Sequence, residues 1–151
     1  MIQNARFQKA ITIGDFGFKL ASTGSELVVN GATNSLLYIG DIETHGVDPE
    51  LGFWMPRNAA AFVGIGTDAV VSNFSTIIDS GTTLVIGPQD QVAELYNKAN
   101  PNATMLEGGL WTYPCDTPPS VSFSWEGKKQ WAITPDKYVF RRPKPKMANP
   151  D

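Results

Sequence analysis

Short runs of alternating apolar and polar residues, separated by turn-forming residues, constrain the fold of this chain most strongly. In the run 121–125 every second residue is apolar, and a Glu-Gly-Lys sequence at 126–128 then leads into a further run at 130–133. Residues 60–79 have the composition of another hairpin, with a turn expected near 66–68. Apolar residues at every second position indicate a strand with one buried face. The spacing of strands and turns therefore predicts an all-β fold of the sandwich or barrel type.

The amino-terminal part of the chain is expected to follow the same plan. Apolar residues alternate with small or polar ones between Phe16 and Leu20, which indicates a strand. Strand-like runs follow at 26–29 and 36–39, and the Asn-Gly pair at 30–31 is a favourable start for a hairpin turn. We therefore expect two further strands in this region, joined by that turn.

One helix stands out from the strand pattern. Apolar residues recur at i, i+3, i+4 and i+7 from Val92 to Ala99, which is the spacing of one helix face. Pro88 lies near the expected first turn, where proline is favoured. The Asn-Pro pair at 100–101 ends the helix, because the residue before a proline disfavours helical geometry. The sequence thus predicts a mainly-β lobe with one or two short helices.

Composition and charge narrow the class of protein. The chain has 151 residues, of which 42% are hydrophobic and 18% charged, which suits one globular domain. Residues 1–140 contain eight Lys or Arg and fourteen Asp or Glu, a net charge of −6, which argues against nucleic acid as a partner. The tail 141–151 is basic and rich in proline, and we expect it to be disordered. No apolar run has the length of a membrane span, and the amino terminus lacks the apolar core of a signal peptide.

The segment 75–88, STIIDSGTTLVIGP, carries the most unusual chemistry. Asp79 follows a β-branched apolar run and precedes Ser-Gly-Thr-Thr at 80–83. A carboxylate beside a hydrophobic strand is costly unless donors hold it. We expect 74–78 to form a buried strand and 84–86 to return to the core, with Asp79 held in its ionised form by nearby hydroxyl and N–H groups. The residues alone also allow a simple Asx-turn, in which Asp79 bonds only its own backbone.

The sequence IIDSGTT, with a Gly-Pro pair and a helix after it, resembles the second active-site segment of the pepsin-like aspartic proteases. Three further segments resemble the same family in the same order. They are FKLASTGSELVVNGATNSLLYIGDIE at 18–43, GFWMP at 52–56 and YPCDTPPSVSFSWEGKKQWAITPDKYVF at 113–140. The resemblance implies that residues 16–140 form most of a carboxy-terminal lobe, similar to that of fungal secreted members, and that residues 1–15 are an amino-terminal extension.

The resemblance also assigns roles to the residues of this segment. Asp79 would be one of two catalytic carboxylates that share a proton, so that one activates a water and the other polarises the scissile carbonyl. The Ser80 hydroxyl would reach the opposite active-site loop, and Thr82 would bond the outer carboxylate oxygen. Gly81 and Thr83 would line the cleft and bind substrate.

The same resemblance implies peptide or protein substrates, bound in an extended form and cleaved beside apolar side chains. It implies no metal and no cofactor, and it gives no role to a membrane. Activity at acid pH and an extracellular or vacuolar location are the family's usual properties. Sequons at Asn73 and Asn102 become relevant to glycosylation only if the protein is secreted.

Parts of the family pattern are not found in this sequence. Asp79 lies in the single Asp-Ser-Gly or Asp-Thr-Gly triplet, and the amino-terminal lobe with its own aspartate is not recognised. The hydrophobic-hydrophobic-Gly segment that supports the aspartate in the family is not recognised after Cys115. The resemblance implies a disulfide partner for Cys115 near the end of the lobe, and 141–151 contain no cysteine. We therefore expect a fragment that is inactive, or nearly so, without a missing lobe or a second copy.

Two other interpretations stay open. Two copies could pair about a twofold axis and bring Asp79 to Asp79, as the smaller subunits of retroviral aspartic proteases do. Alternatively, the chain could be a β-rich module that binds a peptide or a carbohydrate without catalysis, with tryptophan side chains as a stacking surface. The candidates for that surface are Trp54, Trp111, Trp125 and Trp131.

Overall fold

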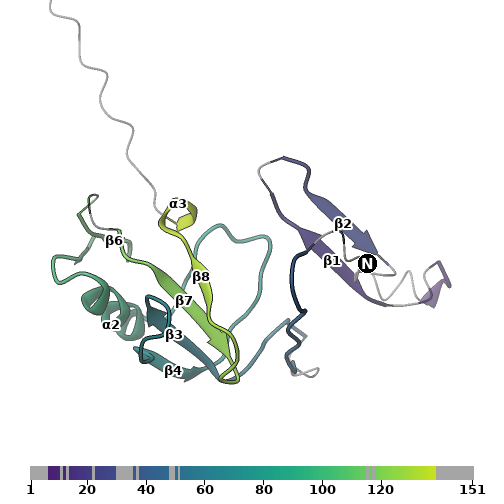
Figure 1. The fold of residues 1–151 in the computed structure, drawn as a ribbon, viewed down its shortest axis with the longest axis horizontal. Coiled ribbons are helices and arrows are strands. Elements are labelled where there is room, and N and C mark those ends of the chain that lie inside the picture. Colours follow the sequence, from purple (N-terminus) through teal and green to yellow (C-terminus); the bar gives the residue numbers. More distant parts are fainter. Residues whose placement is uncertain are drawn as a thin grey trace, which may run out of the picture. The chain divides into compact units, whose positions relative to one another are not determined.

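The computed structural model describes residues 7–10, 12, 14–21, 23–29, 36, 38–47, 50, 52–114, 116 and 118–138. The chain divides into two compact units, Met1–Glu43 and Thr44–Asp151. Short antiparallel strands dominate both units (Figure 1), together with helices α2 (Gln89–Ala99) and α3 (Pro135–Tyr138), so the predicted mainly-β fold class is confirmed. Neither of these two helices is long and apolar enough to cross a membrane.

The first unit contains a two-stranded antiparallel hairpin, formed by β1 (Phe16–Lys19) and β2 (Glu26–Val29). The turn between them is closed by Ser25. Its hydroxyl accepts a hydrogen bond from the Ala21 N–H at 3.0 Å and donates one to the Ala21 carbonyl at 2.8 Å. Both strands agree with the sequence prediction.

The predicted strand at 36–39 is wrong. Leu36, Tyr38 and Ile39 lie outside strands, and the side chain of Leu36 is 89% exposed. A strand needs a neighbour that satisfies its backbone groups. In the part of the chain that the structure describes, β2 belongs to a two-stranded sheet with β1, and no described residue of 36–39 adds a third strand to it. The turn expected at Asn30-Gly31 lies outside the described residues.

The second unit contains a four-stranded antiparallel sheet in the order β4-β3-β7-β8 (Figure 1). Its strands are β3 (Ala59–Val63), β4 (Val71–Phe74), β7 (Val121–Trp125) and β8 (Trp131–Ile133). Both predicted hairpins of this region are therefore confirmed. Because β3 and β7 lie side by side, the two hairpins join into one sheet although about fifty residues separate them in the chain.

The turn between β7 and β8 follows directly from its sequence. Its central residues Glu126 and Gly127 both have positive φ, of 55° and 68°, and the Lys128 N–H donates to the Trp125 carbonyl at 3.0 Å. Two successive residues with positive φ are the pattern of the type I′ hairpin turn, whose twist matches that of the strands.

Three residues of β3 and two serines of β7 are the buried residues of the two central strands: Ala59, Ala61, Phe62, Ser122 and Ser124. Phe62 lies opposite Ser122, and Ala60 lies opposite Ser124, so these four residues share one face of the sheet. The two serines are more buried than the apolar residues of β7 between which they lie. The Ser122 hydroxyl donates to the Gly64 carbonyl at 2.7 Å, which satisfies a polar group that the sheet removes from water.

Helix α2 begins and ends where the sequence predicts. The Val92 N–H donates to the Pro88 carbonyl at 2.9 Å, and the Asn100 N–H donates to the Tyr96 carbonyl at the same distance. The helix packs against β3 and β4 (Figure 1). It therefore joins the segment that contains Asp79 to the sheet from its carboxy-terminal side.

A small hairpin covers another part of α2. It consists of β5 (Thr104–Met105) and β6 (Trp111–Thr112). The rings of Tyr96 and Trp111 stack with centroids 5.1 Å apart and planes 14° apart. Burial of this ring raises the pKa of Tyr96 above its ordinary value, with a smaller contribution from Tyr113.

Candidate active site

The Asp79 carboxylate is held by two donors from the three residues that follow it. The Gly81 N–H donates to Oδ1 at 2.8 Å, and the Thr82 hydroxyl donates to Oδ2 at 2.5 Å. The Thr82 hydrogen bond and then the Gly81 hydrogen bond lower the pKa of Asp79 below its ordinary value. Both donors stabilise the ionised form, and neither is a neighbouring charge.

This geometry combines the two local interpretations of the sequence. The bond from Gly81 to Oδ1 is that of an Asx-turn, in which an aspartate accepts from the backbone two residues later. The bond from Thr82 leaves the turn intact and engages the second oxygen. The turn therefore fixes the rotation of the carboxylate as well as the path of the backbone.

Gly81 is the residue type that this turn tolerates best. A Cβ atom placed on Gly81 would lie 3.2 Å from Asp79 Oδ1, closer than side chains normally approach. The neighbouring oxygen is itself held by the Gly81 N–H, so it cannot move away without loss of that bond. The glycine thus permits the close approach between backbone and carboxylate.

The prediction that 74–78 form a buried strand and that 84–86 return to the core is wrong. Strand β4 ends at Phe74, and residues 75–79 do not continue it. The apolar side chains on both sides of the turn are between 44% and 77% exposed; they are Ile77, Ile78, Leu84, Val85 and Ile86. Asp79 is exposed with them. The backbone N–H groups of Thr76 and Ile78 donate to carbonyls of the 54–56 segment and not to a strand of the four-stranded sheet, so 75–79 do not extend that sheet.

The contact with 54–56 nevertheless fixes the path of the chain toward Asp79. The Thr76 N–H donates to the Pro56 carbonyl at 3.1 Å, and the Ile78 N–H donates to the Trp54 carbonyl at 2.9 Å. In addition, the Trp125 indole N–H donates to the Thr76 hydroxyl at 2.8 Å. Sequence reasoning missed this last contact, because the two residues are far apart in the chain and no local pattern links them.

The other predicted site residues take no part in holding the carboxylate. Ser80 and Thr83 are exposed, and within the described residues neither hydroxyl bonds to Asp79. Their assigned roles stay predictions, as do the catalytic role of Asp79 and the substrate-binding role of Gly81. Cys115 lies outside the described residues.

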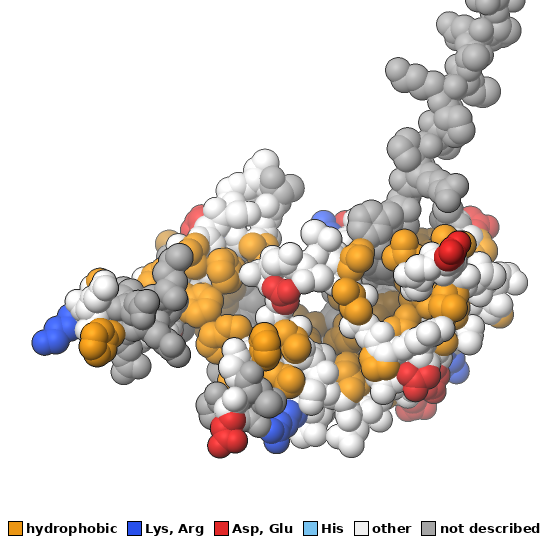
Figure 2. Space-filling model, turned by 180° about the vertical axis from the view of Figure 1, so that it is seen from behind, with side chains coloured by type: hydrophobic (Ala, Val, Ile, Leu, Met, Phe, Trp, Pro, Cys, Tyr) orange, Lys and Arg blue, Asp and Glu red, His pale blue; other side chains and the backbone are white. Residues whose placement is uncertain are grey.

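Hydrophobic side chains come to the surface over much of the face shown in Figure 2. The exposed apolar residues of the second unit include the five that flank Asp79. Single exposed apolar residues are normal, whereas several exposed apolar residues close in sequence to one charged turn are typical of a surface that binds another molecule.

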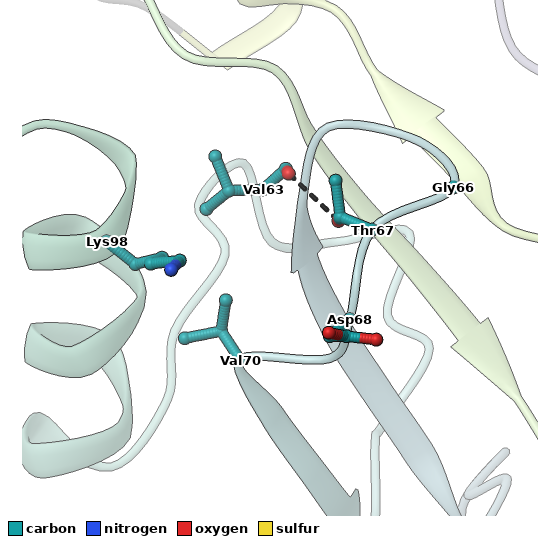
Figure 3. A pocket seen from close by; sticks show the side chains of 6 residues that line it. All are labelled: Val63, Gly66, Thr67, Asp68, Val70 and Lys98. Carbon is teal, nitrogen blue, oxygen red and sulfur yellow. Dashed lines mark hydrogen bonds between the residues drawn. The ribbon is translucent and has the colours of Figure 1, made fainter.

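A separate pocket of about 410 Å³ lies between the β3–β4 turn and the end of α2 (Figure 3). The Thr67 hydroxyl donates to the Val63 carbonyl at 3.0 Å on its wall. None of its lining residues belongs to the Asp79 segment, so the pocket is not part of the candidate site. They are Val63, Gly66, Thr67, Asp68, Val70 and Lys98.

Three of the four tryptophans make separate contacts, and the role of the tryptophans as a stacking surface stays a prediction. Trp111 stacks on Tyr96, Trp125 has its ring 5.8 Å from that of His45, and the Lys129 ammonium lies 4.2 Å above Trp131. In the part of the chain that the structure describes, no three His, Cys, Asp or Glu side chains come together in a way that could hold a metal ion.

Comparisons with known proteins agree with the resemblance. The sequence model of the eukaryotic aspartyl protease family matches residues 2–148. The chain is 36% identical over 126 residues to an aspartic protease of Phaffia rhodozyma, a match that covers 80% of this chain and 30% of that protein. It is 30% identical over 125 residues to secreted aspartyl protease 1 of Malassezia globosa, covering 81% and 29% respectively.

Bovine cathepsin D is 28% identical over 149 residues, covering 93% of this chain and 37% of that protein. The chain therefore spans about a third of the length of these relatives. The matched region includes Asp79, its two donors and the sheet of the second unit. This chain is a member of the eukaryotic aspartyl protease family.

Proposed function

We propose that the protein is an aspartic endopeptidase and that this chain supplies Asp79 as one of its two catalytic carboxylates. The observation that carries the proposal is the Asp79 turn itself. A carboxylate accepts the Gly81 N–H on one oxygen and the Thr82 hydroxyl on the other, on an exposed surface of a chain that belongs to this family.

The chemistry that such a carboxylate supports is water-mediated hydrolysis. In a pair of carboxylates that share a proton, the ionised member takes a proton from a water, which attacks the scissile carbonyl. The protonated member donates to the carbonyl oxygen as charge develops there. The two donors on Asp79 favour its ionised form, whereas a second carboxylate close by would raise one pKa of the pair, so the pair titrates in two coupled steps.

The second carboxylate is proposed to come from a counterpart lobe. Asp79 and its apolar neighbours are exposed, so a partner could approach them without unfolding the unit. We propose that the chain alone is inactive or nearly so. Ser80 would contact the counterpart loop, while Gly81 and Thr83 would bind the backbone of an extended peptide. A secreted or vacuolar location is proposed by analogy with the relative named as secreted.

A hydrolysis assay at acid pH tests this function. The chain is assayed alone, and then mixed with the portion of the Phaffia rhodozyma protease that lies outside the 126 matched residues. We expect no hydrolysis by the chain alone, and hydrolysis blocked by a statine-type inhibitor in the mixture. Inhibitor-sensitive hydrolysis by a strictly monomeric chain contradicts the proposal that this chain supplies only one of the two carboxylates. A stable complex of the two components that shows no hydrolysis contradicts the proposed function.

Sedimentation of the same samples shows whether the second carboxylate comes from the counterpart lobe or from a second copy of this chain. If activity appears in the chain alone and only when it sediments as a dimer, Asp79 of one copy pairs with Asp79 of the other. That outcome would keep the aspartic endopeptidase and replace the proposed counterpart.

A further inference from the structure

We propose that Trp125 is a positioning residue for Asp79. Its indole N–H donates to the Thr76 hydroxyl at 2.8 Å, three residues before the candidate catalytic carboxylate. The catalytic consequence of this contact rests on the proposed function. Its effect on the geometry of the Asp79 segment does not, and can be measured separately.

The donor belongs to a well-fixed part of the second unit. Trp125 ends strand β7, where it lies opposite Ala59 of β3. Its carbonyl accepts the Lys128 N–H at the β7–β8 turn, and its half-buried ring lies 5.8 Å from that of His45. Sheet pairing, the turn and ring packing together hold the indole in place, so it can act as a fixed point for a less constrained segment.

The acceptor, Thr76, takes part in three hydrogen bonds. The Thr76 hydroxyl accepts the indole N–H and, at 3.5 Å, is oriented to donate to the Pro56 carbonyl. The same carbonyl accepts the Thr76 N–H at 3.1 Å. One hydroxyl can donate one hydrogen bond and accept others, so all three contacts are compatible. Thr76 thus links β7 to the 54–56 segment.

Side-chain packing cannot provide the same constraint. The Ile77 and Ile78 side chains are 55% and 52% exposed, and β4 has already ended at Phe74. Between Thr76 and Asp79 the path of the chain is fixed by the Ile78 N–H bond to the Trp54 carbonyl. A small displacement of a catalytic group lowers the rate strongly, because reaction needs a narrow range of geometry. A bond that fixes Thr76 therefore has a direct effect on Asp79.

Four variants of this chain test the role, with amide hydrogen exchange of Ile78 as the readout. W125F keeps an aromatic ring and removes the N–H, and T76V keeps the shape and removes the hydroxyl. We expect each to raise the Ile78 exchange rate about fivefold, which is the effect of one lost hydrogen bond. T76S retains a hydroxyl and should restore the slow rate. W131F is the matched control, because Trp131 lies on β8 and its ring contacts the Lys129 ammonium.

The double variant W125F/T76V should exchange no faster than either single variant, because both remove the same bond. An unchanged Ile78 rate in W125F and T76V overturns the proposal. Equal acceleration of the β3 amides overturns it too, since the effect would then be a general loss of stability. If W125F does not fold, T76V and T76S decide the question alone.

In the active mixture, W125F should lower kcat about tenfold with little change in KM, while T76S stays near the original kcat. A changed KM with an unchanged kcat contradicts positioning. D79N in the same mixture distinguishes the two proposals. If D79N keeps full activity, the proposed function fails, whereas the exchange result for Trp125 stands or falls independently.

Discussion

At the Asp79 turn, each carboxylate oxygen accepts one hydrogen bond, and the two donors differ in kind. The Gly81 N–H belongs to the backbone and is present in any variant that keeps the turn. The Thr82 hydroxyl belongs to a side chain and can be removed by a single substitution. The contribution of the Thr82 hydroxyl to the pKa of Asp79 can therefore be measured without a change in the turn.

Thr82→Ala is expected to raise the pKa of Asp79 toward its ordinary value, because the largest cause of the lowered pKa is the Thr82 hydrogen bond. The measurement is the titration of the Asp79 carboxyl carbon by NMR. Thr82→Ser should keep the lowered pKa. Thr83→Ala is the control, since the described residues show no bond from Thr83 to this carboxylate. Equal shifts in the two alanine variants would contradict the assignment.

The lowered pKa of Asp79 determines how this carboxylate affects the stability of the fold at different pH values. A carboxylate whose pKa is lower in the folded chain stabilises the fold above its unfolded pKa, and this contribution is lost as the pH falls through the folded value. Asp79 is exposed, so its main consequence is the charge state of the turn rather than the stability of the unit.

Among the elements, the hairpins of the sheet and helix α2 could be predicted because their signals are local. The alternating pattern of β7, the Glu-Gly turn after it and the Pro88 and Asn100 boundaries of α2 all act within a few residues. Two expectations failed for a common reason. Residues 36–39 and 74–78 have the composition of strands, but a strand forms only with a partner, and the identity of that partner depends on residues distant in the chain.

In the candidate site too, contacts between residues close in sequence could be predicted, and contacts between distant residues could not. The bond between Thr82 and Asp79 spans three residues and could be expected from the sequence. The bond between Trp125 and Thr76 spans forty-nine residues and could not. The burial of Ser122 and Ser124 within β7 was also not predictable, because it depends on which face of the sheet the neighbouring elements cover.

Glu126 of the β7–β8 turn lies beside two basic side chains, Lys128 and His45. The Lys128 ammonium lies 2.9 Å from Glu126 Oε2 and also donates to the Thr44 carbonyl at 2.7 Å. His45 Nδ1 lies 3.4 Å from the same glutamate oxygen. The hydrogen bond from Lys128 is the largest cause that lowers the pKa of Glu126, and the bond to His45 adds to it.

Glu126→Gln is expected to make unfolding less sensitive to pH on the acid side. A glutamate with a lowered folded pKa stabilises the fold above its ordinary value of 4.5, and this stabilisation is lost as the pH falls through the folded value. Urea unfolding of the variant and of the original chain over that range checks this. Glu107→Gln, in the β5–β6 turn, is the control. The same pH dependence in E126Q and the original chain would rule out the proposed contribution.

Considering the whole molecule, apolar side chains beside Asp79 are exposed, and the chain matches about a third of the length of each relative. Apolar surface of this extent is stabilised when another surface covers it. Under the proposed function, that surface is the counterpart lobe, and the residues around Asp79 contribute to association as well as to the site.

Val85→Lys tests whether this surface is an interface. The Val85 side chain is 72% exposed, so the substitution should change the free energy of unfolding of the chain by less than about 0.5 kcal/mol. It should weaken binding of the counterpart portion, measured by sedimentation of the mixture, because a charge would be buried there. Ile65→Lys, at the β3–β4 turn and 65% exposed, should leave binding unchanged. Equal binding by both variants would place the interface elsewhere.

We propose that Asp79 takes part in hydrolysis, and kcat of the Asp79→Asn variant in the active mixture is the measurement that decides it. Asp68→Asn is the matched control, an exposed aspartate at the β3–β4 turn. We expect D79N to lower kcat by about 10²- to 10⁴-fold, the usual contribution of a general acid or base, and D68N to keep the original kcat. If D79N and D68N have the same kcat, Asp79 has no catalytic role.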